Sequence, residues 1–247
     1  MNCYFVFEGQ TEPIVYKEWL KLLVPDLEEV DFPHQVVNNH YIQFSDMGLP
    51  QLYQVVQDAI ADINESEARF DYLVVVMDAD QLSVETRREK LLAYLKKEVN
   101  VESSLYRTLP NFCQLVIIVQ QVCIETWFLG NSSFVPTHPK NDLLKKYKAY
   151  FDVCNHNPEL MAADFVSIDK STLFGCSTRA QFHAKYFNEV FKERTRKGGY
   201  SKSKPKEVIA ASYLNRLIKR QQETAHLASF KTFLDFCATL NKQLANT

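Results

Sequence analysis

Four acidic residues in this sequence each follow a short apolar run, at the places where an α/β protein positions its ligand. The carboxyl ends of parallel strands meet at one edge of a sheet, and ligands bind in the crevice beyond that edge. We therefore expect the four carboxylates to gather at one sheet edge. They are Glu8 after Asn2–Phe7, Asp78 and Asp80 after Phe70–Met77, and Glu125 after Phe112–Val119.

Carboxylates that gather in this way are typical of a site for a divalent cation. Asp78 and Asp80 are two residues apart, so an extended backbone would point both side chains the same way. Neighbouring carboxylates repel one another unless a positive charge lies among them. Hard oxygen ligands with no His or Cys nearby favour Mg²⁺ or Mn²⁺ over zinc. A cation held by carboxylates most often serves phosphoryl chemistry, by activating water and neutralising developing charge.

Each acid also has a simpler explanation when it is taken alone. Asp78 and Asp80 are residues of a type that favours strand-ending turns. Glu8 could complement the dipole of the helix that follows it, and Glu125 could be a polar residue in a first helical turn. The metal-site interpretation depends on the four acids following the same ends of three different strands.

The elements that must position these acids alternate between strands and helices as far as about residue 130. The three apolar runs named above are hydrophobic on both faces, which is typical of buried parallel strands. This alternation predicts an α/β fold, a Rossmann-like, mostly parallel sheet flanked by helices with right-handed crossovers. Further short strands are expected at His34–Val37 and Tyr41–Phe44, and helices after Thr11, at Pro50–Ile63, at Ser83–Val99 and from Val122.

From Asp142 onward the pattern changes to helices, which are separated near their middle by a basic loop at Arg194–Lys204. We therefore expect a metal-binding domain in residues 1–135 and a helical, basic region in residues 136–247. Helices are expected at Lys140–Tyr150, Ala180–Glu193, Pro205–Gln222 and Leu227–Leu244. The candidates for contact with a nucleic-acid backbone are Arg194, Arg196, Lys197, Lys202 and Lys204.

Composition narrows the class of protein. The 247 residues carry a formal net charge of −2, but residues 1–100 hold 18 acids and 8 bases, and residues 101–247 hold 12 acids and 20 bases. No apolar stretch long enough for a membrane span and no export leader are visible, so a soluble cytoplasmic protein is expected. The six cysteines show no ligand spacing, and we expect buried or half-buried thiols.

Three motifs in this order resemble those of TOPRIM domains. Phe5–Glu12 is similar to the opening TOPRIM strand that ends in Glu-Gly with a second Glu shortly after, and Asp78–Asp80 is similar to the TOPRIM D-x-D. The form of the first motif, together with Glu125-Thr-Trp-Phe-Leu129, resembles the OLD-like nuclease branch. That branch includes small stand-alone TOPRIM proteins of bacterial anti-phage defence systems.

The resemblance implies a Mg²⁺-dependent nuclease with a TOPRIM-like fold, and thus a toxic effector in anti-phage defence. Glu8, Asp78 and Asp80 would be the catalytic acids and metal ligands, and Glu12 and Glu125 would be further metal ligands. OLD-like nucleases also use a lysine that no motif identifies here, which leaves Lys202 and Lys204 as candidates. The chain has no Walker A motif, so a separate ATPase partner is inferred.

Two other functions are compatible with the same residues. The protein could be a non-catalytic TOPRIM-like subunit that binds metal or nucleic acid in a larger defence complex with a separate ATPase. It could also be a nucleotide-sugar transferase, whose D-x-D likewise follows a strand and holds Mn²⁺, although this leaves Glu8 and Gly9 unexplained. The choice among DNA, RNA and tRNA, and that between a monomer and a homo-oligomer, stay open.

Overall fold

The computed structural model describes the whole chain except residues 46–47, 50, 100–107, 164–173, 196–197 and 247. It contains two compact units. The first, called here the sheet unit, consists of residues 1–77, 84–119 and 232–247. The second, the helical unit, consists of residues 78–83 and 120–231. The predicted division at residue 135 between a metal-binding and a basic region stays a prediction.

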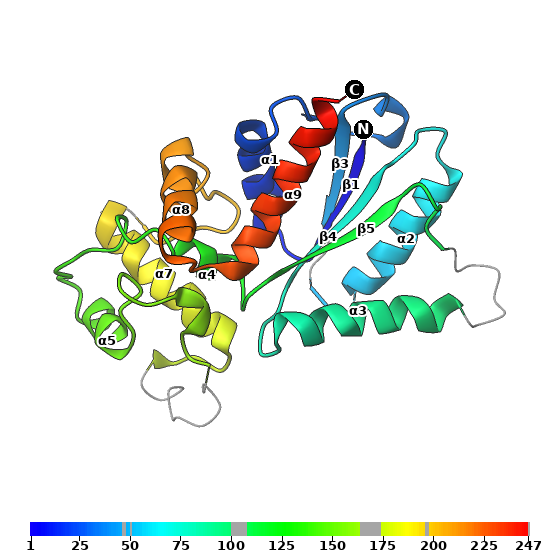
Figure 1. The fold of residues 1–247 in the computed structure, drawn as a ribbon. Helices are drawn as coiled ribbons and strands as arrows, with labels where there is room; N and C mark the ends of the chain where they lie inside the picture. Colours follow the sequence, from blue (N-terminus) through cyan, green and yellow to red (C-terminus); the bar gives the residue numbers. More distant parts are fainter. Residues whose placement is uncertain (46–47, 50, 100–107, 164–173, 196–197, 247) are drawn as a thin grey trace. The chain divides into compact units, whose positions relative to one another are not determined.

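A five-stranded parallel sheet forms the centre of the sheet unit (Figure 1). The strand order is β2-β3-β1-β4-β5. On one side Phe5 pairs with Gln43, and on the other it pairs with Val74. The predicted α/β class with a parallel sheet is confirmed. The strands are β1 (Cys3–Phe7), β2 (Glu28–Glu29), β3 (His40–Ser45), β4 (Tyr72–Asp78) and β5 (Gln114–Gln120).

Helices cover both faces of this sheet because β1 and β4 are apolar on both sides. Every side chain of β1 is buried. On the face of α1 and α9, Phe233 lies 4.6 Å from Tyr16, ring centroid to ring centroid. On the face of α2 and α3, the Tyr4 hydroxyl donates to Asp62 at 2.8 Å (Figure 1). The helices are α1 (Thr11–Leu23), α2 (Gln51–Glu65), α3 (Val84–Val99) and residues 232–244 of α9 (Ala228–Leu244).

The strand order creates a switch point between β1 and β4. From β1 the chain crosses through α1 to β3 on one side, and later crosses through α2 to β4 on the other. In open α/β sheets ligands bind beyond the carboxyl ends of the strands at such a point. Glu8 follows β1 and Asp78 ends β4, so the acids predicted from the sequence follow the two strands that flank the switch point.

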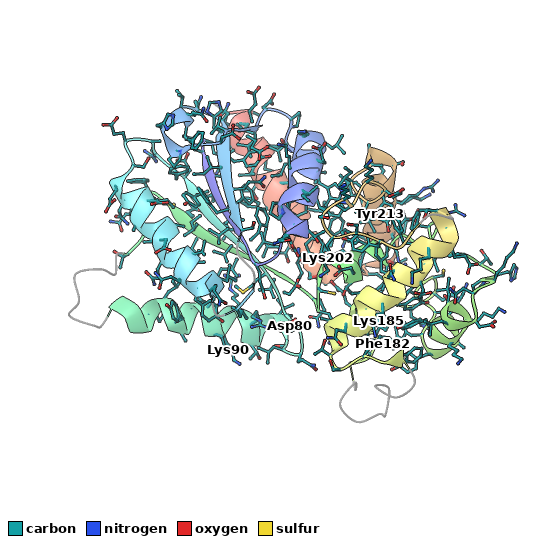
Figure 2. The ribbon with its side chains drawn as sticks, turned by 180° about the vertical axis from the view of Figure 1, so that it is seen from behind. Asp80, Lys90, Phe182, Lys185, Lys202 and Tyr213 are labelled. Atoms are coloured by element: carbon teal, nitrogen blue, oxygen red, sulfur yellow. The ribbon has the colours of Figure 1, made fainter. Side chains whose placement is uncertain are left out.

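The helical unit is built around aromatic side chains, and the predicted helical C-terminal region is confirmed. Figure 2 shows Phe182 and Lys185 on α7 and Tyr213 on α8. Phe182 is fully buried, whereas Lys185 is exposed. The Tyr213 hydroxyl donates to the carbonyl oxygen of Phe128 at 2.7 Å, which joins α8 to α4. The helices are α4 (Ile124–Phe128), α5 (Asp142–Tyr150), α7 (Arg179–Thr195), α8 (Ala211–Thr224) and a 3₁₀ turn at Pro158–Leu160.

A buried carboxylate anchors the first turn of α9 within the helical unit. Glu159 accepts hydrogen bonds from the backbone amides of Ala228 at 2.7 Å and Ser229 at 2.9 Å. Ser229 Oγ in turn accepts from the Trp127 indole at 2.7 Å and from the Gln121 amide at 3.0 Å. The amides at a helix start lack partners within the helix, so this carboxylate supplies them. The network also holds α4 and the loop before it in place.

Two predicted elements differ in the structure. The strand expected at His34–Val37 is wrong: Pro33–Gln35 forms a 3₁₀ turn. The side-chain oxygen of Gln35 accepts from the backbone amides of Asp31 and Phe32, both at 3.0 Å, which closes that turn. The helix expected from Pro205 begins instead at Ala211, after a series of turns.

The cysteines lie where the sequence predicts, buried or half-buried. All six cysteines are free, and all are buried except Cys154, which is half-buried. Trp19 and Trp127 are fully buried. None of the helices in the described ranges is long and apolar enough to cross a membrane.

Candidate functional site

Two backbone hydrogen bonds join the loops that follow β4 and β5 in the helical unit. The amide of Ala79 donates to the carbonyl oxygen of Gln120 at 2.9 Å, and the amide of Asp80 donates to that of Val122 at 3.0 Å. These bonds hold the Asp78–Asp80 loop beside the loop that leads into α4. Asp78, Asp80 and Glu125, which are predicted to bind metal, therefore follow the ends of two adjacent strands.

Both loops contain a residue in the left-handed region of backbone conformation. The φ angle is +53° at Asp80 and +71° at Val122. Asp tolerates this region, but a β-branched Val there is strained. Such strain commonly lies at functional sites, where the surrounding structure enforces it. The expectation that Asp78 and Asp80 share an extended backbone is wrong, because the chain leaves the strand at Asp78 and turns at Asp80.

Glu125 is a buried carboxylate in the first turn of α4. Its side chain is 1% exposed, and neither oxygen makes a hydrogen bond within the described part of the chain. The Lys202 ammonium lies 3.4 Å from Oε1, and the Lys202 side chain is 65% exposed. A carboxylate in this position needs a positive charge close by, since burial without one is costly. Lys202 supplies that charge from the solvent side.

The loop that carries Lys202 is held by an aromatic anchor. The ring of Tyr200 packs 4.9 Å from Phe187 and 6.0 Å from Phe128, centroid to centroid. Its backbone amide donates to Asn188 Oδ1 at 2.9 Å. Two residues further on, Lys202 meets Glu125 (Figure 2 labels Lys202). The anchor thus fixes where Lys202 approaches Glu125.

Two of the predicted metal ligands affect the pKa of the buried Cys123 thiol. Its pKa is raised well above the ordinary value, first by burial and then by the negative charges of Glu125 and Asp78. The thiol therefore stays protonated and is a poor nucleophile. Because both carboxylates act on one buried group, Asp78 and Glu125 lie within electrostatic range of the same point in the helical unit.

Glu8 and Glu12 belong to the sheet unit. The Glu8 amide donates to the carbonyl oxygen of Val76 at 3.0 Å, and its carbonyl oxygen accepts from Gly48 at 3.0 Å. Glu12 is 5% exposed in the first turn of α1. Its carboxylate lies so close to Gly9 that a side chain on Gly9 would collide with it. Gly9 therefore provides the space that Glu12 occupies.

The donor set suits a hard divalent cation, because every candidate ligand is a carboxylate. Among the residues that the structure describes, however, no three Asp, Glu, His or Cys side chains form a group that could hold a metal ion. Asp78, Asp80 and Glu125 all belong to the helical unit. The five-residue site that also includes Glu8 and Glu12 stays a prediction.

The basic residues predicted to contact nucleic acid separate into three groups. Lys202 pairs with Glu125, and Lys204, two residues further along the chain, is exposed. Arg194 lies in the last turn of α7 and lines a pocket of about 350 Å³ together with Arg216 of α8. Arg196 and Lys197 lie outside the described residues.

Sequence reasoning missed the pairing of Lys202 with Glu125, although Tyr200 in the basic loop was a usable signal for a packed segment. In the comparisons with known proteins, no family model, no curated protein and no solved structure matches this chain.

Proposed function

We propose that this protein is a divalent-metal-dependent nuclease that hydrolyses phosphodiester bonds of DNA or RNA, tRNA included. One observation carries the proposal. The hydrogen-bonded loops after β4 and β5, each with a left-handed residue, hold Asp78, Asp80 and Glu125 in one compact unit. Strained loops that carry acids at adjacent strand ends are typical of a catalytic site.

In this proposal Asp78, Asp80 and Glu125 bind Mg²⁺ or Mn²⁺, and Glu8 and Glu12 are further predicted ligands. The bound cation would supply an activated water and offset charge on the phosphate. The ammonium of Lys202 neutralises Glu125, and its largely exposed side chain is able to turn towards an anionic substrate. The buried Cys123 thiol stays protonated and takes no part as a nucleophile.

The exposed bases of the same unit support a polyanionic substrate. Lys202, Lys204 and Arg194 are all exposed on the helical unit, and each contact with a phosphate would add salt dependence to binding. The resemblance to small OLD-like TOPRIM proteins further suggests a toxic effector in anti-phage defence that works with a separate ATPase. The role as a toxic effector and the separate ATPase are both part of the proposal.

The test is a cleavage assay with purified protein. Plasmid DNA, total RNA and tRNA are incubated with Mg²⁺, Mn²⁺ or EDTA, in parallel with Glu8→Ala and Asp78→Ala. We expect cleavage of one substrate class that requires metal and falls at least about 10³-fold in both variants. Cleavage that persists in both variants would rule out the assigned acids.

One observation favours a second candidate, a metal- or nucleic-acid-binding subunit without catalysis. The carboxylate of Glu125 is paired with Lys202, so one of the proposed metal ligands already has a cationic partner. If no substrate is cut under any condition, a binding measurement separates the candidates: the subunit would still shift a labelled oligonucleotide in a salt-dependent manner. A nucleotide-sugar transferase would instead bind nucleotide sugars in the presence of Mn²⁺.

Gly9→Ala tests the contribution of Glu12. The new methyl group would displace the Glu12 carboxylate, because nothing else at Gly9 gives way as easily as the end of that side chain. We expect cleavage to fall about tenfold or more, with a loss of less than about 1 kcal/mol in the free energy of unfolding. Gly198→Ala is the matched control, since no atom of the described residues, apart from its chain neighbours, lies within 4 Å of its added methyl group. Unchanged cleavage in Gly9→Ala would remove Glu12 from the site.

A further inference from the structure

A polar pocket of about 400 Å³ lies in the helical unit and contains none of the acids discussed above. We call it the α8 pocket. Its volume is in the range of small-molecule sites in proteins. The walls are the turn after α4, the turn after α5, the last turns of α8, and His226, which follows α8. The residues that line it include Asn131, Cys154, Arg216, Lys219, Arg220 and His226.

Arg220 is a buried cation in the wall of this pocket. It is 7% exposed, and its guanidinium donates to the carbonyl oxygens of Gly130 at 2.9 Å and His156 at 2.8 Å. No carboxylate lies within ion-pair distance of it in the described ranges of the chain. Carbonyl partners orient the guanidinium without pairing its charge directly, and Asp152 acts on it only from beyond ion-pair distance. A buried charge is stable mainly when it is paired. An anion in the pocket would complete the arrangement.

The rest of the wall is also cationic. Arg216 and Lys219 lie on α8 beside Arg220, and the wall contains one carboxylate, Glu223, which lies 3.6 Å from Lys219. His226 adds a neutral donor: its Nδ1 accepts from Arg220 at 3.2 Å, so the ring proton is on Nε2. Three cations, one carboxylate and an N–H donor favour a ligand with more than one negative charge.

We propose that the α8 pocket binds the phosphate group of a nucleotide-sized ligand. Phosphate is dianionic near neutral pH, and its oxygens match the forked donors of arginine. The remaining volume and the polar wall at Asn131 leave room for a sugar and base. The ligand is a free mononucleotide or the phosphorylated end of a short nucleic acid, which present the same chemistry. This proposal stands or falls independently of the proposed nuclease.

The experiment is calorimetric titration in EDTA, so that no metal-dependent cleavage contributes. The probes are inorganic phosphate, AMP and a 5′-phosphorylated trinucleotide. We expect AMP or the trinucleotide to bind more tightly than phosphate, and the tighter of the two identifies the source. In Arg216→Ala/Lys219→Ala the affinity should fall about 10-fold or more, because charge-assisted contacts are lost. Lys145→Ala/Lys146→Ala, which removes two exposed lysines of α5, should bind like the wild type.

A second readout uses Cys154, which lines the pocket and is half-buried, whereas the other five cysteines are buried. A bound nucleotide should slow the alkylation of Cys154 several-fold in the native protein, as followed by peptide mass spectrometry. Arg216 and Lys219 are exposed, so the double variant should keep the wild-type melting temperature. The proposal is overturned if no probe binds, if the double variant binds equally well, or if Cys154 is not protected.

Discussion

Replacing Lys202 by alanine is expected to tighten the binding of Mn²⁺ or Mg²⁺ about tenfold, because an ammonium group that competes for the Glu125 carboxylate is removed. The effect is limited by solvent, since the lysine side chain is 65% exposed. Isothermal titration in the absence of nucleic acid measures it directly. Cleavage by the same variant should fall, since an exposed cation beside the proposed site is lost.

Two further variants make this prediction decisive. Glu125→Gln keeps the size of the side chain but removes the charge, and it should lose metal binding and at least about 100-fold of the cleavage rate. Lys204→Ala removes an exposed lysine of the same loop, and should bind metal like the wild type. Tighter binding in Lys204→Ala, or unchanged binding in Glu125→Gln, would place the metal elsewhere.

The free energy of unfolding should decrease as the pH falls below about 6.5, through the protonation of His183 in the unfolded chain. This residue is fully buried, with Nδ1 2.8 Å from Thr126 Oγ1 and Nε2 3.0 Å from the carbonyl oxygen of Met161. Burial, and then the positive charge of Arg179, lower its pKa to about 3. Between the two pKa values the unfolded chain binds more protons, so folding weakens as acid is added. The slope is about 1.4 kcal/mol per pH unit between pH 6 and pH 4.

Denaturant titrations at several pH values between 7.5 and 4.5 measure this slope. In His183→Gln the amide keeps a donor and an acceptor but does not titrate, so the slope should decrease by the contribution of one proton. His34→Gln is the control, because His34 is exposed on the 3₁₀ turn Pro33–Gln35. An equal slope in His183→Gln and the wild type would show that other groups dominate the acid response.

The strands of the sheet could be predicted because their signal is local. Runs such as Tyr72–Met77 are apolar on both faces, and only a central parallel strand buries both. The turn at Pro33–Gln35 could not be predicted in the same way, because a side-chain amide, rather than a hydrophobic pattern, determines it. The late start of α8 is similar, since it depends on where turns before Ala211 end.

The candidate site could be predicted in part. The apolar runs before Asp78 and Glu125 show that each of these acids follows a strand end. The backbone of Asp80 could not be foreseen, because it depends on a hydrogen bond to Val122 on a different loop. The partner of Glu125 is set by the packing of Tyr200 on Phe128, a tertiary contact that no spacing in the sequence encodes. The charge of Lys202 was visible in the sequence, but its position was not.

The late position of residues 232–244 in the chain affects how the protein folds during its synthesis. They cover the sheet-unit face that includes Phe5, and Asn241 donates to the carbonyl oxygen of Leu23 across 218 residues of chain. At about 5–20 residues per second, translation of that interval takes roughly 10–40 s. During this time the first strand and helix have emerged without their covering helix. The nascent chain thus presents this apolar surface to chaperones until residues 232–244 have been translated.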